Sequence, residues 1–131
     1  MSKVLIIGAG GVGLMGVRFA KAVLGREPIV ADIDENKRKL ALANGACAAV
    51  DPREKEARKQ VMDLTGGSGV AAAIDFVGNE ASAQFGWRAL GRGGRLVVVG
   101  LFGGSFSTPL PMFPFTGNAI MGSVTGTPAE M

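Results

Sequence analysis

The six residues Gly8-Ala9-Gly10-Gly11-Val12-Gly13 constrain the fold of this 131-residue chain more than any other feature. They follow the apolar run 4–7 directly, and apolar residues at helical spacing come after them. A G-x-G-x-x-G sequence between a strand and a helix is typical of a phosphate-binding turn. Gly8 would permit the tight turn, Gly10 would let a pyrophosphate approach the backbone, and Gly13 would let the helix pack close to the sheet.

Strand-like and helix-like segments alternate along the rest of the chain. The predicted strands are 4–7, 29–31, 46–50, 71–77, 95–99 and 119–124, and the predicted helices are 14–24, 35–44, 53–64 and 80–90. Prolines at 109, 111 and 114 predict that segment 102–117 contains no regular helix, and 128–130 resembles a helix start. This alternation predicts one α/β domain over residues 1–131, a doubly wound six-stranded parallel sheet with helices on both faces.

Asp32 ends the second predicted strand, 19 residues after Gly13. A carboxylate at this place would accept hydrogen bonds from both adenosine ribose hydroxyls and would repel a 2′-phosphate. The next residue, Ile33, is apolar, and Asp34, which is also the expected cap of the second helix, adds a second negative charge. The sequence therefore favours NAD over NADP. Lys37 could reach the same ribose, or it could be a solvated lysine on the helix surface.

The composition excludes several functions. The chain has no histidine and one cysteine, Cys47, which rules out a disulfide framework, Ser-His-Asp hydrolysis and the usual zinc ligand sets. Cys47 is expected to be a small buried residue. No apolar run approaches the length of a membrane span, and the basic residues are not interleaved with aromatic ones, which argues against membrane and nucleic-acid partners. No signal segment precedes the first strand, so a cytoplasmic location is expected.

Several motifs of the sequence resemble those of one known protein family. The glycine turn, then Val30-Ala31-Asp32-Ile33-Asp34 with Lys37, then Leu42-Ala43-Asn44-Gly45-Ala46 resemble the coenzyme domain of zinc-type medium-chain alcohol and polyol dehydrogenases. Segments 74–78, 93–101 and 122–127 continue the resemblance in the family's order. It implies a Rossmann fold with strand order 3-2-1-4-5-6 and a cofactor that, besides the glycine turn and Asp32, touches the ends of the fourth, fifth and sixth strands. Together with the motif, it assigns these residues to the cofactor: Gly8, Gly10, Gly11, Val12, Gly13, Asp32, Ile33, Lys37, Phe76, Val77, Gly78, Val99, Gly100, Leu101, Ser123, Val124 and Thr125.

The resemblance also implies what this chain does not contain. In that family a separate domain binds the substrate and the catalytic zinc, through Cys, His and acidic ligands that this sequence does not supply. We therefore assign no catalytic or metal-binding residue, and expect the chain to bind NAD without catalysing dehydrogenation alone. In the family the sixth strand pairs across a dimer axis. That edge, with Met112, Phe113 and Phe115 exposed, predicts a homo-oligomer, unless the neighbouring prolines cover it.

Three other functions fit parts of the sequence. A free-standing NAD-sensing regulatory domain would have this size and glycine turn, but the entry to the fifth strand, Gly93-Gly94-Arg95, matches the dehydrogenases better. A zinc-independent quinone or enoyl reductase usually prefers NADPH and lacks an acid such as Asp32. A methyltransferase using S-adenosylmethionine also has a glycine turn, but the close turn into a helix found here suits a pyrophosphate.

Overall fold

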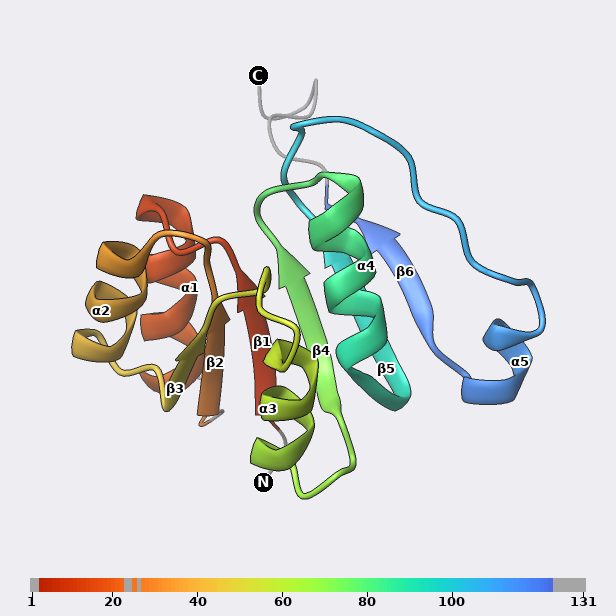
Figure 1. Ribbon diagram of the computed structural model, residues 1–131, viewed down its shortest axis with the longest axis horizontal. Coiled ribbons are helices and arrows are strands. Elements are labelled where there is room, and N and C mark those ends of the chain that lie inside the picture. The colour runs from red at the N-terminus through yellow and green to blue at the C-terminus, as the bar shows by residue number, and fades with distance from the viewer. Residues whose placement is uncertain (1–2, 23–24, 26, 124–131) are drawn as a thin grey trace.

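The computed structural model describes residues 3–22, 25 and 27–123, and they form a six-stranded parallel sheet with the order β3-β2-β1-β4-β5-β6 (Figure 1). The strands are β1 (Lys3–Ile7), β2 (Glu27–Ala31), β3 (Ala48–Val50), β4 (Val70–Asp75), β5 (Leu90–Val98) and β6 (Ala119–Gly122). The helices are α1 (Gly11–Ala22), α2 (Glu35–Ala43), α3 (Ala57–Leu64), α4 (Glu80–Ala89) and α5 (Met112–Thr116). The predicted α/β class and the Rossmann strand order are confirmed.

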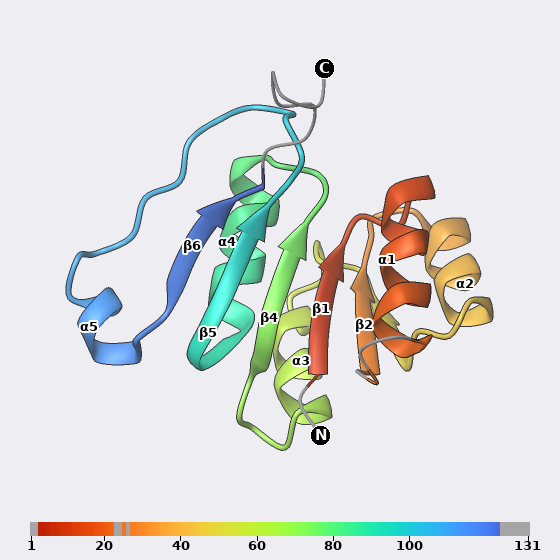
Figure 2. The same cartoon turned by 180° about the vertical axis from the view of Figure 1, so that it is seen from behind.

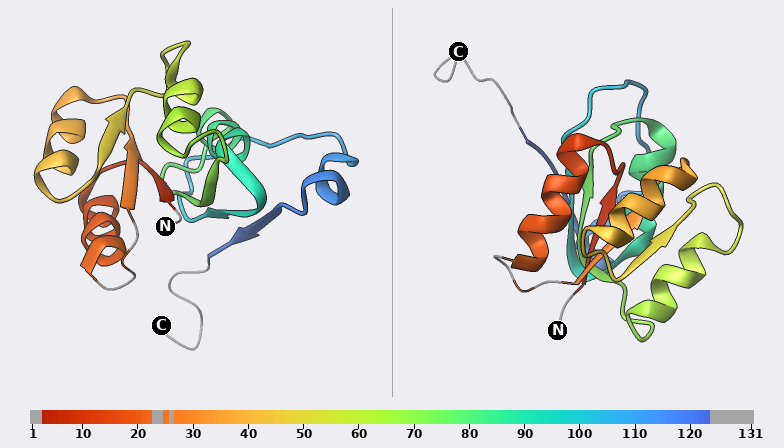
Figure 3. Two further views of the ribbon diagram at one scale, coloured as in Figure 1. Left: turned by 90° about the horizontal axis from the view of Figure 1, so that it is seen from below. Right: turned by 90° about the vertical axis from the view of Figure 1, so that its left-hand side faces the viewer.

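Helices pack on both faces of the sheet, as predicted (Figure 3). Because side chains alternate along a strand, Leu5 and Ile7 of β1 face α3 and α4, while Val4 and Ile6 face α1 and α2. All four side chains are buried, so β1 is the centre of the core. Viewed from behind, β5 and β6 lie in front of α4, and no helix of the described residues covers this side of them (Figure 2).

The strand order places a crevice beside the glycine turn. All strand pairs are parallel, so every strand ends at the same edge of the sheet. The order reverses at β1, where the chain passes to β2 on one side and β4 lies on the other. The Gly8 N–H donates to the Ala31 carbonyl (2.8 Å), and the Phe76 N–H donates to the Ile7 carbonyl (2.9 Å). In sheets of this type, ligands bind at such a switch point.

Two helix starts differ from their predicted positions. Helix α1 begins at Gly11 rather than at residue 14, because the glycine turn itself supplies the first turn and the Leu14 N–H donates to the Gly10 carbonyl (2.8 Å). Helix α3 begins at Ala57 rather than at residue 53, because the Asp51 carboxylate accepts the Arg53 N–H (3.0 Å) and holds that segment in a turn. The Asp34 cap of α2 is confirmed.

The segment between β5 and β6 contains a helical turn that the prolines argued against. Helix α5 is five residues long and ends at Gly117, whose φ of 68° is left-handed. Pro114 fits there because the N–H groups of a first helical turn need no intrahelical partner. The prediction of no regular helix was therefore wrong for this turn.

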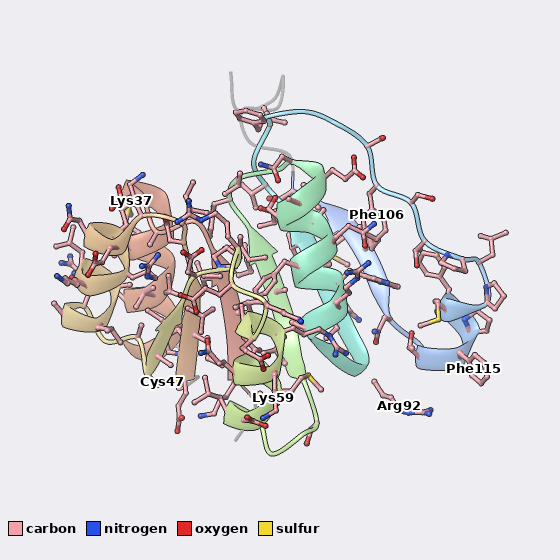
Figure 4. All side chains as sticks on the ribbon, in the orientation of Figure 1. Lys37, Cys47, Lys59, Arg92, Phe106 and Phe115 are labelled. Carbon is pink, nitrogen blue, oxygen red and sulfur yellow. The ribbon has the colours of Figure 1, made fainter. Side chains whose placement is uncertain are left out.

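The aromatic residues of this segment attach it to α4. The Trp87 ring lies 5.2 Å from the Phe113 ring and 5.9 Å from the Phe106 ring. Phe113 is therefore half-buried, not exposed as predicted, because Trp87 offers it an apolar partner. Met112 and Phe115 are exposed, as predicted, and Phe115 lies on α5 at the far end of the molecule (Figure 4).

Cys47 is exposed, which corrects the prediction that it is buried (Figure 4). Strand β3 begins only at Ala48, so Cys47 precedes the sheet instead of lying within it. Its N–H donates to the Pro28 carbonyl (2.8 Å), which fixes the backbone there without burying the side chain.

Candidate dinucleotide-binding site

Gly8 and Gly13 shape the turn between β1 and α1. Gly8 has a φ of 92°, and a Cβ atom there would lie 3.0 Å from a methyl carbon of Val77. A Cβ atom on Gly13 would lie 2.0 Å from the carbonyl oxygen of Gly8. Only a residue without a side chain allows α1 to approach the strand end this closely. The structural roles predicted for these two glycines are confirmed.

Gly10 and Gly11 face open space at the start of α1. No heavy atom lies within 4 Å of the position that a Cβ atom would take on either residue. The first N–H groups of a helix have no intrahelical partner and carry the positive end of its dipole. The first turn of α1, which includes Val12, has no acidic residue to compete for these groups. The turn is therefore open to an anion, and the cofactor contacts of Gly10, Gly11 and Val12 remain predictions.

Asp32 joins the end of β2 to the glycine turn. Its side chain is 8% exposed, and Oδ2 accepts the Ala9 N–H (2.7 Å) while Oδ1 accepts the Asp34 N–H (2.8 Å). Each carboxylate oxygen has two lone pairs, so both oxygens retain the capacity to accept a hydroxyl. Asp32 therefore holds the turn in place, a role that was not predicted from the sequence. Its contact with a ribose remains a prediction.

A pocket of about 240 Å³ opens beside Asp32 at the carboxyl ends of the strands. Its walls are mostly apolar, and Asp32 and Arg53 are its charged residues. The lining residues are Ile7, Gly8, Ala31, Asp32, Ile33, Pro52, Arg53, Val77, Asn79, Ala81 and Ser82. A larger cavity, of about 710 Å³, lies at the opposite ends of the strands, next to Lys3, Val70 and Gly91, and contains none of the predicted site residues.

The turn after β4 is organised by Asp75, which is fully buried. Its Oδ1 accepts the N–H groups of Val77 (2.9 Å) and Gly78 (3.0 Å), and its Oδ2 accepts the Ser82 hydroxyl (2.7 Å). Ser82 and Asn79 also form a reciprocal cap on α4. Asp75 thus fixes Val77 against the pocket. Asp75 was not among the predicted site residues, although a lone carboxylate within the apolar segment 71–77 is a sequence signal for such a role.

The turns after β4 and β5 meet backbone to backbone. The N–H groups of Val99 (2.9 Å) and Gly100 (3.0 Å) donate to the Asp75 carbonyl. A Cβ atom on Gly78 would lie 2.0 Å from the Gly100 carbonyl oxygen, so a side chain at Gly78 would separate the two turns. The structure therefore brings Gly78, Val99 and Gly100 together, close to Val77 and the glycine turn.

Other predicted site residues lie away from the pocket. The Phe76 side chain packs in the core beneath α1, next to Gly16. Lys37 is exposed on the first turn of α2 and does not line the pocket (Figure 4). Leu101 is 93% exposed, and Ser123 is exposed with its N–H donating to the Val98 carbonyl (3.0 Å). Val124, Thr125 and the helix start anticipated at 128–130 lie outside the described residues.

Two arginines from outside the β2 segment approach its end. Arg38 Nη1 donates to the Asp32 carbonyl (2.7 Å), and Arg53 Nη2 donates to the Ile33 carbonyl (3.1 Å). Both also face Asp51: Arg53 donates to it from Nε (3.1 Å) and Nη2 (2.9 Å), and Arg38 lies 3.7 Å away. The hydrogen bonds from Arg53 lower the pKa of Asp51 to about 2. Neither arginine immediately follows Asp32 in the sequence, so neither was among the predicted site residues.

The fold and this crevice define a class, the dinucleotide-binding domain of Rossmann type, and comparison with known proteins identifies the family. Residues 11–131 match the zinc-binding dehydrogenase family. The chain is 39% identical over 105 residues to L-threonine 3-dehydrogenase of Pyrococcus furiosus, covering 80% of this chain and 30% of that protein. It is 31% identical over 127 residues to an NAD-dependent alcohol dehydrogenase of Saccharolobus solfataricus, covering 96% of this chain and 37% of that protein. The crystal structure of alcohol dehydrogenase from Aeropyrum pernix superposes with a TM-score of 0.89 at 39% sequence identity, and the match covers 98% of this chain and 37% of that one.

The chain belongs to the zinc-binding dehydrogenase family and corresponds to the coenzyme domain of its medium-chain alcohol and polyol dehydrogenases. It spans about a third of the length of these relatives. Among the described residues no three His, Cys, Asp or Glu side chains come together as a metal site, so the zinc implied by the family name does not fit there. No helix in the described ranges is long and apolar enough to cross a membrane.

Proposed function

We propose that this chain is the NAD-binding domain of a zinc-type medium-chain alcohol or polyol dehydrogenase. The observation that carries the proposal is the position of Asp32, whose carboxylate holds the glycine turn and also lines the pocket. A single ligand can therefore contact both the Asp32 carboxylate and the open start of α1 at Gly10 and Gly11. A pyrophosphate linked to an adenosine ribose has this combination of groups.

The residues present would divide the dinucleotide among them. The N–H groups at the start of α1 would bind the phosphates, and Asp32 would accept the ribose hydroxyls. The apolar wall formed by Ile33, which is 57% exposed, and Val77 suits an adenine ring. The nicotinamide half would extend toward a second group of residues, Val99, Gly100, Leu101, Ser123, Val124 and Thr125. When bound, NAD supplies the hydride-accepting ring, and this chain's part is to bind and orient it.

NAD rather than NADP is the proposed cofactor because Asp32 would repel a 2′-phosphate. The name of the Saccharolobus solfataricus relative, an NAD-dependent alcohol dehydrogenase, supports this choice. The substrate and zinc sites of the whole enzyme would lie in residues that flank this domain, in keeping with the share of its relatives that the chain spans. We accordingly propose that the 131-residue chain alone does not oxidise alcohols, and that the whole enzyme is cytoplasmic.

The edge of β6 is the proposed contact between two copies of the chain. Strand β6 is the last strand of the sheet, and Met121 on it is exposed, as are Met112 and Phe115 of the nearby α5. An edge strand beside apolar side chains offers both hydrogen-bonding groups and surface to a second copy. Light scattering at micromolar concentration is expected to give a mass above that of the monomer, 13.4 kDa, and a strictly monomeric mass would contradict the proposal.

Calorimetric titration with NAD and NADP, side by side, tests the cofactor proposal. Saturable NAD binding with much weaker NADP binding is expected. Asp32→Asn should weaken NAD binding and reduce the difference in affinity between NAD and NADP. The control Asp34→Asn removes the same charge from a residue that does not line the pocket, and it should change the affinity for NAD less. Equal affinity for both cofactors in the unaltered chain would favour the quinone or enoyl reductase branch. Binding of neither would contradict the proposal.

A further inference from the structure

Arg53 places a cation at the ribose end of the pocket, although no arginine follows Asp32 in sequence. It comes from the turn between β3 and α3 and lines the pocket together with Asp32 and Ile33. Its Nη2 donates to the Ile33 carbonyl, one residue from the carboxylate that would contact the ribose. The guanidinium is therefore fixed at the mouth of the pocket, with its side chain 66% exposed to any ligand that enters.

Asp51 neutralises this cation. Two nitrogens of Arg53 donate to the two carboxylate oxygens of Asp51, in the parallel geometry that a guanidinium also uses for phosphate. Arg38 approaches the same carboxylate, so Asp51 is shared by two arginines. The lowered pKa of Asp51 keeps it ionised at neutral pH. These contacts use Nε and Nη2 of Arg53, so the Nη1 donors take no part in them.

We propose that Arg53 is a specificity-determining residue, a ligand for an adenosine 2′-phosphate that Asp51 masks. The proposal rests on the proposed function, since it concerns the ribose end of the same dinucleotide site. Two carboxylates then set the preference for NAD: Asp32 repels the 2′-phosphate directly, and Asp51 withholds the arginine that would bind it. Removing either one exposes a site for a phosphate monoester beside the ribose.

The test uses 2′,5′-ADP and 5′-ADP as probes, with NAD and NADP, in calorimetric titrations of the purified chain. Asp51→Asn keeps the oxygen that accepts the Arg53 N–H and removes the charge that pairs with the guanidinium. Its affinity for 2′,5′-ADP and NADP should rise about three- to fivefold, the change expected for one solvent-exposed charge interaction. Its affinity for 5′-ADP and NAD should change by less than about twofold, since neither carries a 2′-phosphate.

Two further variants separate the proposed contact from a general charge effect. Adding Arg53→Gln to Asp51→Asn should abolish the gain in affinity for 2′,5′-ADP. Asp63→Asn removes the same charge from the exposed pair with Lys59 on α3 and should leave the affinity for all four probes unchanged. The inference is overturned by a gain that survives Arg53→Gln, by an equal gain in Asp63→Asn, or by no gain in Asp51→Asn while NAD still binds. Failure of the unaltered chain to bind NAD would refute the proposed function, and this inference with it.

Discussion

Replacing Gly13 with alanine tests the packing on which the whole site depends. The added methyl carbon would lie 2.0 Å from the Gly8 carbonyl oxygen, which is over 1 Å inside ordinary contact. The obstructing atom belongs to the backbone, and the Gly8 N–H is itself bonded to Ala31 in the neighbouring strand. Neither side can rotate away, so α1 must move off the sheet.

The size of the effect follows from two opposed terms. Overpacking typically costs about 1–3 kcal/mol, and the upper end of about 3 kcal/mol applies here because the backbone must shift. Alanine in place of glycine inside a helix stabilises the folded state by about 1 kcal/mol, because alanine has the higher helix propensity. The steric term is larger, so Gly13→Ala should lower the free energy of unfolding by about 2 kcal/mol, a large share of the stability of a small domain.

Gly11→Ala and Gly10→Ala are the matched controls, because neither added methyl meets an atom within 4 Å. Gly11→Ala lies at the first position of α1 and should be neutral or stabilising by up to about 1 kcal/mol. Gly10→Ala precedes the helix and should cost less than about 1 kcal/mol in stability. It should nevertheless abolish NAD binding, because its methyl group occupies the space proposed for the pyrophosphate.

Urea unfolding followed by the fluorescence of Trp87, with calorimetric titration of NAD, measures both effects. The reasoning about helix packing is refuted if Gly13→Ala unfolds within about 0.5 kcal/mol of the unaltered chain. The proposed path of the pyrophosphate is refuted if Gly10→Ala binds NAD with undiminished affinity.

Two further predictions concern carboxylates at strand ends. Asp75→Ala leaves the partly buried N–H groups of Val77 and Gly78 without their acceptor and should cost about 2–5 kcal/mol in unfolding free energy. Asp75→Asn retains one oxygen for these N–H groups and should cost less. Urea unfolding of both variants checks this order, and an equal cost would contradict it. The pKa of Asp51 is lowered from 3.8 to about 2 in the folded chain, so its stabilising contribution is complete above the unfolded value and is lost as the pH falls through about 2. The difference in unfolding free energy between the unaltered chain and Asp51→Asn should therefore be constant near neutral pH and shrink between pH 3.8 and about 2.

The fold was predictable because its determinants are local and repeat along the chain. Most strands contain a short apolar run, the crossovers up to the fifth strand have a helical spacing, and parallel crossovers of one hand leave few arrangements. The glycine turn was predictable for a similar reason. Gly8 and Gly13 meet each other across five residues, so the spacing of the motif already contains the geometry that the structure displays.

Properties that depend on distant partners were not predictable in the same way. Phe113 belongs to an exposed-looking segment, and only its contact with Trp87 on α4 buries half of it. Cys47 adjoins an apolar strand pattern, but β3 begins at Ala48, so Cys47 lies just before the strand and its side chain is exposed. In both cases the local sequence does not determine whether the side chain is exposed or buried.

The part of the pocket next to Asp32 combines both situations. Asp32 was predictable because an acid at the end of the second strand has a fixed distance from the glycine turn. Arg53 and Asp51 follow a different strand, and they reach the same place only because β3 is parallel to β2 and ends beside it. A rule that inspects only Asp32 and the residues directly after it therefore detects Asp32 but not Asp51, the second carboxylate proposed to set the cofactor preference. Charges that adjacent parallel strands bring to one edge of the sheet should be counted together when such a preference is predicted from sequence.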